Sequence, residues 1–526
     1  MSQATVFYNG GIYNPHQGAR ASAVGVCDGS IGAVGTDSEV LGQFPDAHRI
    51  NLEGRRVLPG FIDSHIHLLS HGLTLNRIDL KGVASLETCL RIVGDRASGA
   101  PPGDWIMGRG WNYNIWAEGR LPTRQDLDAV CPDHPAALRS VDGHLTWCNT
   151  RALEMAGVTG DTPDPDGGRI RRDAATGAPT GILAETAARL VNNHIPQPSV
   201  EARRSALQQA ILSAVRAGLT GIHDCNGDDI YEDLQAIRES DGLSLRFWLM
   251  VPASRLDDAV ANGRRTGQGD EWLRTGALKV FADGALGPKT AAMLAPYEGS
   301  DDVGVVVNDA QGLTAIFGRA HANGLEVACH AIGDRAVRDV LDAVEAVGHT
   351  IPGPFRPRVE HAQILHPHDV PRFSRLGAIA SMQPIHATSD MHFADRYLGP
   401  RARLAYAWQS ILNTGACLAF GSDCPVESLS VLEGIHAAVT RQRPDGHPPD
   451  GWYPEERLTV HEAIHAYTLG AAYAAGEEAE KGSLQPGKLA DMVVLSRDIT
   501  AIPPEEILHT EVVLTIVGGR IVYDGR

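Results

Sequence analysis

The stretch VLPGFIDSHIH at residues 57–67 is an apolar run that ends in two histidines. Residues i and i+2 of a strand point to the same face of a sheet, so His65 and His67 can bind one metal ion together. The order of a Pro-Gly pair, an apolar strand and His-x-His favours a metal site. The alternative is a pair of polar residues on a strand edge.

Three later apolar runs also end in metal-ligand residue types, namely His330, His361 and Asp423. Imidazole and carboxylate groups at strand ends suit Zn²⁺ or a similar divalent cation that keeps an open position for water. Taken alone, each of these two histidines could be a hydrogen-bonded core residue, which is the commoner role of a single histidine. A fourth run, 277–281, carries Lys279 inside an apolar strand, where an unpaired ammonium would be costly.

The centre of the chain alternates such strands with helical stretches, which predicts βα units and a parallel sheet. Eight strands form the closed sheet of a (β/α)8 TIM barrel, and the chemistry of such barrels lies at the carboxyl ends of the strands. The ligand residue types fall at those ends. The eight expected strands lie near 57–67, 219–224, 245–251, 277–283, 325–330, 357–361, 377–383 and 416–423.

Both ends of the chain contain short apolar arms separated by turn residues such as Asn9-Gly10 and Asp28-Gly29. We therefore expect an α/β protein with a small β-sandwich domain built from residues 1–57 and 481–526. The barrel is expected over 58–99 and 201–480. A subdomain inserted after the first barrel strand is expected over 100–200, a stretch rich in Pro, Gly, Asp and aromatic residues.

Composition limits the partners and the location of the protein. The 526 residues include 46 Lys+Arg and 64 Asp+Glu, a formal charge of −18, which argues against nucleic acid or an anionic membrane as the main partner. The eight cysteines include no C-x-x-C pair, which favours a reducing compartment. Neither a signal peptide nor a membrane-spanning run is expected, so we expect a cytoplasmic protein.

Motifs spread over nearly the whole chain resemble the amidohydrolase superfamily, and within it the YtcJ-like group that includes N-substituted formamide deformylase. The motifs are PGFIDSHIHL (59–68), SVDGHLTWCNTRAL (140–153), GGRI (167–170), PTGILAE (179–185), KVFADGALG (279–287), HAIGDRAV (330–337), RVEHAQIL (358–365), ASMQPIHATSDM (380–391), AFGSDCPVES (419–428) and KGSLQPGKLADMVVL (481–495). The resemblance implies a metal-dependent barrel with a sandwich made from both termini.

The resemblance also implies how the ligands are used. One or two divalent metals, Zn foremost, would be held by His65, His67, Lys279, His330, His361 and Asp423. Lys279 would be carboxylated by CO₂ to a carbamate that bridges two metals; the alternative is a salt bridge to Asp283 or a neighbouring residue. Asp423 would also be the catalytic group that moves a proton. The alternative reading makes Asp423 a helix N-cap.

The same resemblance implies hydrolysis of a non-peptide C–N bond in a small amide, N-acyl amine or N-formyl amine, by metal-activated hydroxide. An ester or lactone hydrolase, a non-hydrolytic biosynthetic enzyme (decarboxylation, cyclisation or isomerisation) and a non-catalytic binding protein stay open, as does a homo-oligomeric state. Substrate-binding roles are predicted for His144, Asp142, His386 and Trp111, each with a purely structural alternative.

Overall fold

The computed structural model describes residues 4–13, 21–141, 143–350 and 355–526. Its largest sheet has eight parallel strands in the order β20-β19-β18-β17-β16-β15-β14-β7. The ends of this sheet meet where the N–H of Asp423, after β20, donates to the carbonyl of His65 in β7 at 2.7 Å. The strands are β7 (Phe61–Ile66), β14 (Leu219–Asp224), β15 (Arg246–Pro252), β16 (Leu273–Phe281), β17 (Val327–Ala331), β18 (Arg358–His361), β19 (Ile379–Met382) and β20 (Leu418–Phe420). The predicted barrel is confirmed.

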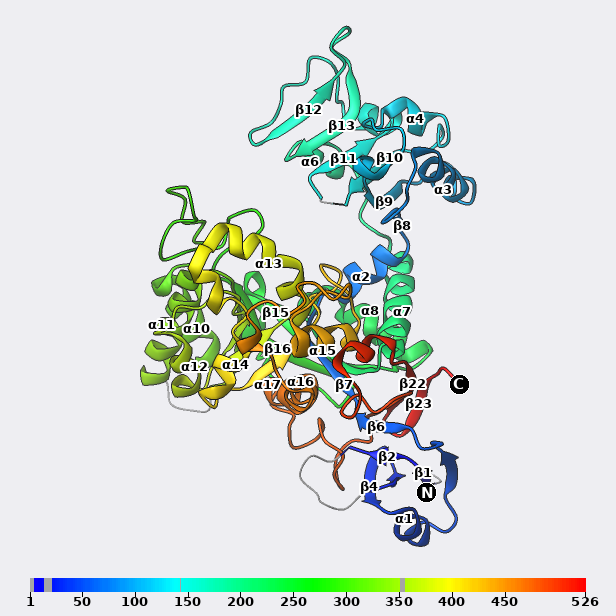
Figure 1. Ribbon diagram of the computed structural model, residues 1–526, viewed down its shortest axis with the longest axis vertical. Coiled ribbons are helices and arrows are strands. Elements are labelled where there is room, and N and C mark those ends of the chain that lie inside the picture. The colour runs from blue at the N-terminus through cyan, green and yellow to red at the C-terminus, as the bar shows by residue number, and fades with distance from the viewer. Residues whose placement is uncertain (1–3, 14–20, 142, 351–354) are drawn as a thin grey trace. The chain divides into compact units, whose positions relative to one another are not determined.

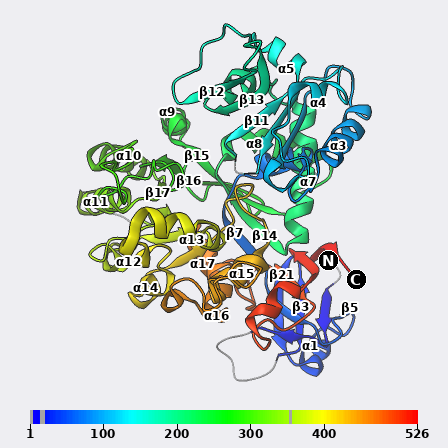
Figure 2. The same ribbon diagram turned by 45° about the horizontal axis from the view of Figure 1, so that its top comes forward.

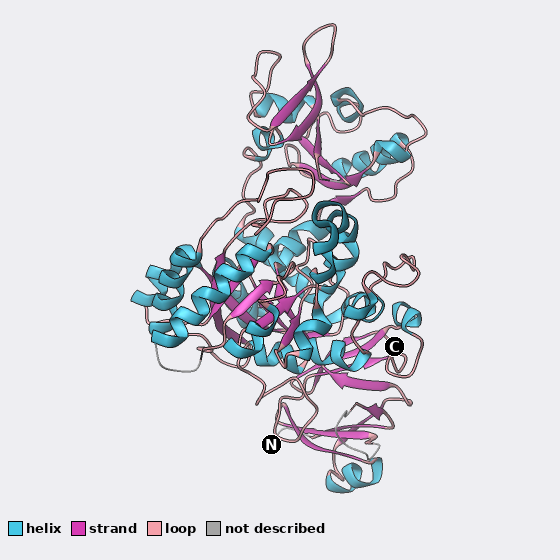
Figure 3. Ribbon diagram, turned by 60° about the vertical axis from the view of Figure 1, so that its left-hand side comes forward, coloured by secondary structure: helices cyan, strands magenta, loops and turns pink. Residues whose placement is uncertain are grey.

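Helices enclose these strands, as Figure 3 shows by colour. Every residue of β7, β14 and β18 is buried, because parallel strands covered by helices have no solvent face. The helices between or after the barrel strands are α7 (Val200–Arg216), α8 (Gly227–Ser240), α9 (Leu256–Ala261), α10 (Ala310–Ala322), α11 (Asp334–Thr350), α12 (Val370–Leu376), α13 (Pro384–Leu398), α14 (Trp408–Asn413), α15 (Val431–Thr440), α16 (Val460–Ala466) and α17 (Leu469–Ala474).

Two further sheets are built from the ends of the chain, as predicted: one from N-terminal strands alone and one from strands of both ends. In one of them, β6 pairs antiparallel with β21, which places early and late segments side by side in Figures 1 and 2. An apolar core between the two sheets takes side chains from both ends, including Phe7, Val57 and Met492. The first sheet is β4-β3-β1-β5 and the second is β2-β6-β21-β22-β23. Their strands are β1 (Thr5–Tyr8), β2 (Gly11–Ile12), β3 (Ala23–Cys27), β4 (Ser30–Gly35), β5 (His48–Asn51), β6 (Arg56–Pro59), β21 (Met492–Leu495), β22 (Val512–Val517) and β23 (Arg520–Asp524).

The chain divides into two compact units, and the second unit is Gly72–Ala206. It therefore begins earlier than the expected insertion at 100–200, because β8 (Ile78–Asp79) pairs with β9 (Ile106–Trp111) and α3 (Leu86–Ser98) packs on the same small core. Its six-stranded sheet has the order β12-β13-β11-β10-β9-β8. The other strands are β10 (Ala136–Ser140), β11 (Leu145–Cys148), β12 (Gly168–Arg172) and β13 (Pro179–Glu185), with helices α4 (Arg124–Asp128), α5 (Thr150–Met155) and α6 (Ala188–Asn192).

Within the described parts of the chain, no helix combines the length and the apolar composition that crossing a bilayer requires.

Candidate metal centre

His65 and His67 lie at the carboxyl end of β7, and each is hydrogen-bonded to a residue in or just after another barrel strand. The Nδ1–H of His65 donates to Glu360 Oε2 at 2.6 Å, and the Nδ1–H of His67 donates to Asn226 Oδ1. A histidine held in this way presents its Nε2 to a metal in a fixed orientation. Both Nε2 atoms face Asp423 Oδ1, at distances of 3.6 Å and 3.4 Å.

His330 and His361 come from the ends of the neighbouring strands β17 and β18. The Nδ1–H of His361 donates to Gln383 Oε1 at 2.8 Å, and the Nε2–H of His330 donates to the Gly284 carbonyl at 2.9 Å. The His361 ring centroid lies 4.6 Å from that of His330 and 4.7 Å from that of His65. Three strands thus bring together imidazoles that each keep one nitrogen bound to protein and one available.

Asp423 follows β20 and completes a buried group with His65 and His361, whose ligand atoms lie within 4.8 Å of one another. The backbone is left-handed at both Asp423 (φ 56°) and His361 (φ 71°). Such conformations cost about 1–3 kcal/mol each in non-glycine residues, and they cluster at functional sites. The alternative of a helix N-cap at Asp423 is wrong, because a turn follows and the next helix begins at Val431, capped by Ser430.

Lys279 lies in β16 and is 4% exposed, yet its Nζ has no hydrogen-bond partner among the described residues. The alternative of a salt bridge to Asp283 is absent from these residues. The Asp283 carboxylate instead accepts backbone N–H groups from Ala292, Ile332 and Gly333 at 2.8–3.0 Å. The amine lies 5.1 Å from the centroid of the Phe281 ring, and an added group or charge would satisfy its hydrogen-bonding capacity.

The electrostatics of the centre differ between its ligands. Burial lowers the pKa of His67, but the Asp423 carboxylate outweighs it and raises that pKa above its usual value. Burial, assisted by the nearby Lys279 cation, lowers the pKa of both His65 and His330 to about 4, so both imidazoles are neutral at pH 7. Burial alone would raise the pKa of Asp423, but the hydrogen bond from His67 and the surrounding histidines hold it well below its usual range. Neutral imidazole and ionised carboxylate are the forms that bind a divalent cation.

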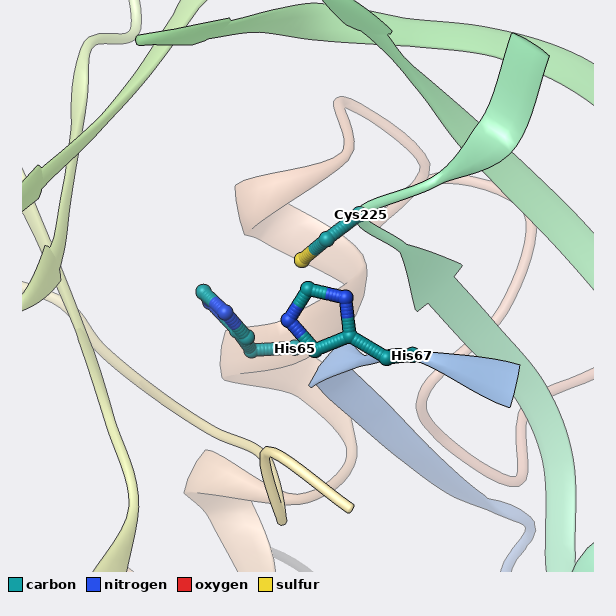
Figure 4. Close-up of side chains that lie close together, drawn as sticks. All are labelled: His65, His67 and Cys225. Atoms are coloured by element: carbon teal, nitrogen blue, oxygen red, sulfur yellow. The ribbon is translucent and has the colours of Figure 1, made fainter. Parts of the chain in front are cut away.

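The end of β14 and the residue after it are hydrogen-bonded to the backbone around His67. Asp224 Oδ2 accepts the Leu68 N–H at 2.8 Å, and the Cys225 N–H donates to the Ile66 carbonyl at 2.9 Å. The Cys225 sulfur and the ligand nitrogens of His65 and His67 lie within 4.8 Å of one another. Figure 4 shows this sulfur pointing toward the two imidazoles.

The residues predicted to bind substrate lie in different surroundings. His386, in the first turn of α13, places Nε2 3.6 Å from Asp423 Oδ2 and stacks on His361. In the Gly72–Ala206 unit, His144 pairs with Glu185 at 2.8 Å and its side chain is 63% exposed. Trp111 is fully buried in the core of that unit, and Asp142 lies outside the described residues. Their roles toward substrate stay predictions.

Comparison with known proteins agrees with this geometry. Residues 49–523 match the amidohydrolase family. The chain belongs to the amidohydrolase family. It is 34% identical to the putative amidohydrolase YtcJ of Bacillus subtilis, over 99% of each chain, and 30% identical to the N-substituted formamide deformylase of Arthrobacter pascens, over 96% of this chain and 95% of that protein. An uncharacterized metal-dependent hydrolase from Pyrococcus furiosus has a similar structure, with a TM-score of 0.79, 28% identity and coverage of 94% of this chain and all of that one.

This amidohydrolase is therefore a hydrolase of carbon–nitrogen bonds with a candidate metal centre at the barrel strand ends. Sequence reasoning missed the groups that orient its ligands: Glu360, Asn226, Gln383 and the neighbouring Cys225. One signal was available. Cys225 and Asn226 directly follow the strand that ends at Asp224, which is the same position in a barrel unit as that of the predicted ligands.

Proposed function

We propose that this amidohydrolase is a metal-dependent enzyme that hydrolyses the C–N bond of a small N-acyl or N-formyl amine. The observation that carries the proposal is the convergence of His65, His67, His330, His361 and Asp423, with the second nitrogen of each histidine already bound to protein. The substrate class is supported by the 30% identity to a protein named N-substituted formamide deformylase.

The residues present fit a divalent metal, Zn²⁺ first among them. Imidazole nitrogens and a carboxylate are its usual ligands, and the histidines are held by carboxylate, amide and carbonyl oxygens as metal-binding histidines commonly are. The buried Nζ of Lys279, which has no hydrogen-bond partner among the described residues, fits a carbamate, which would convert this amine into an anionic ligand. One metal would use His65, His67 and Asp423, and a second would use His330 and His361 with the Lys279 carbamate.

The metal, when bound, lowers the pKa of water toward ~7 and polarises the substrate carbonyl. Asp423, which is ionised because its pKa is held well below the usual range, would accept the proton of the attacking water. It then delivers this proton to the amine nitrogen as the C–N bond breaks, so that amine and carboxylate leave. His386, whose Nε2 lies 3.6 Å from Asp423 Oδ2, would hydrogen-bond the substrate next to this transfer.

A cytoplasmic location is part of the same proposal. All eight cysteines are free, and six of them are buried. Free thiols persist in a reducing compartment, where a framework of disulfides would not form. The formal charge of −18 fits a small-molecule substrate better than nucleic acid.

A substrate panel tests the proposed function. Zinc-loaded protein is incubated with N-formyl and N-acyl amines and with esters and lactones that carry matched acyl groups, and products are identified by mass spectrometry. Release of free amine with the addition of one water, from the amides before the esters, is the expected result. Preferential ester cleavage, or products formed without water, would contradict it.

A further inference from the structure

His65 and His67 have a residue of a metal-ligand type on each side, because β7 lies between β20 and β14 in the barrel. On the β20 side, the backbone N–H of Asp423 is bonded to the His65 carbonyl and its Oδ1 faces both Nε2 atoms. On the β14 side, the backbone N–H of Cys225 is bonded to the carbonyl of Ile66, the residue between the two histidines. The two flanking segments therefore hold one side chain each at the same pair of imidazoles.

The side chains on either side of Cys225 hydrogen-bond to His67 and to the residue that follows it. Asn226 accepts the Nδ1–H of His67, and Asp224 accepts the N–H groups of both Leu68 and Asn226. These bonds fix the backbone of the turn on both sides of Cys225. The thiol is 5% exposed, and its sulfur lies within 4.8 Å of the ligand nitrogens of both histidines, as Figure 4 shows.

We propose that Cys225, as a thiolate, is a ligand of the metal that His65 and His67 hold. The inference rests on the proposed metal-dependent function and names an additional ligand for it. As the metal–sulfur bond forms, the thiol proton leaves to solvent, so the cysteine contributes one negative charge. Thiolate is a soft ligand that favours Zn²⁺ over Mg²⁺ or Mn²⁺, and its presence would specify the metal more narrowly than imidazole and carboxylate do.

Other cysteines near the centre lack this placement, which makes them controls. Cys329 is fully buried and precedes His330, but it belongs to no group of possible ligands among the described residues, and its thiol donates to the His330 carbonyl at 3.8 Å. Cys424 follows Asp423, but its sulfur lies 3.1 Å from His71 Nδ1. Proximity to a ligand in the sequence is therefore not what distinguishes Cys225.

The test is X-ray absorption at the zinc edge on zinc-loaded full-length protein. We expect a sulfur shell at about 2.3 Å beside the nitrogen and oxygen shell at about 2.0–2.1 Å. Cys225→Ser should remove the sulfur shell and weaken zinc binding at least about tenfold, whereas Cys329→Ser should keep both unchanged. With cobalt in place of zinc, only the Cys225→Ser protein should lose the sulfur-to-metal charge-transfer absorption.

The wild-type spectrum decides the matter even if Cys225→Ser does not fold. Zinc bound through nitrogen and oxygen alone would overturn the role of Cys225 and leave the proposed function standing. A protein that binds no zinc after reconstitution would overturn both. A sulfur shell that persists in Cys225→Ser and disappears in Cys329→Ser would identify Cys329 as the sulfur ligand and so overturn the inference.

Discussion

The barrel centre and the Gly72–Ala206 unit hold their polar side chains in different ways. In the barrel centre, His65 and Glu360 are both at most 1% exposed and bonded to each other across the barrel. In the Gly72–Ala206 unit, the pair His144–Glu185 is 63% and 54% exposed. A buried pair whose groups are hydrogen-bonded to each other fixes one geometry, whereas an exposed pair contributes about 0–1 kcal/mol and stays adaptable. The centre is therefore built for chemistry at fixed positions, and the exposed pair is free to serve recognition.

Replacing Asp423 should break the barrel centre most severely. Asp423→Asn keeps the shape of the side chain but removes the group that accepts a proton, so kcat should fall by about 10²–10⁴-fold. Steady-state kinetics on the best amide of the substrate panel measures this. Asp390→Asn is the matched control, because Asp390 lies in the same barrel but accepts hydrogen bonds from Tyr406 and Gln363. An unchanged kcat in Asp423→Asn, or an equal loss in both variants, would remove Asp423 from catalysis.

Lys279→Met tests whether the barrel centre needs an added group. If the Lys279 carbamate bridges two metals, methionine cannot replace it, and metal content should fall by about one ion per chain. Metal analysis of the purified proteins measures this, together with a mass increase of one CO₂ on wild-type Lys279 under neutral conditions. A Lys279→Met protein that keeps all its metal and gains stability would instead identify Lys279 as an unpaired buried amine, whose removal relieves a desolvation cost.

Glu360→Gln probes the residues that orient the ligands. The Glu360 carboxylate accepts the His65 Nδ1–H at 2.6 Å and is itself held by Arg358 Nε at 2.8 Å. Weakening such a partner typically lowers metal affinity 10–100-fold, and we expect a change in this range for zinc. Competition with a chelator measures the affinity. Glu326→Gln is the control, since Glu326 accepts a backbone N–H from Arg356 outside the centre. Equal affinities in the two variants would show that Glu360 is not needed to orient His65.

The contrast between the two regions also explains what the sequence could predict. A barrel collects the ends of its strands in one place, so ligand types at strand ends, such as His65 and Asp423, predicted a shared centre before any contact was known. The pairing of Glu360 with His65 depends on which residues of different strands come face to face, and no spacing along the chain encodes that. The start of the second unit at Gly72 was missed for a related reason, since it depends on the pairing of β8 with β9. Cys225 does follow a strand directly, so the strand-end rule could have found it.

The smallest expected effect concerns the exposed pair of the Gly72–Ala206 unit. His144→Ala removes a side chain whose ion pair with Glu185 is exposed, so the loss of this pair should change the free energy of unfolding by less than about 1 kcal/mol. If His144 contacts the substrate, KM should rise while kcat and zinc affinity stay close to wild type. Comparing several amides sharpens the result, because a recognition residue should affect some substrates more than others. His194→Ala, which also removes an exposed histidine of this unit, is the matched control. Unchanged kinetics for every amide would show that the His144–Glu185 pair does not contact the substrate. A loss of kcat without a change in KM would show that His144 stabilises the transition state.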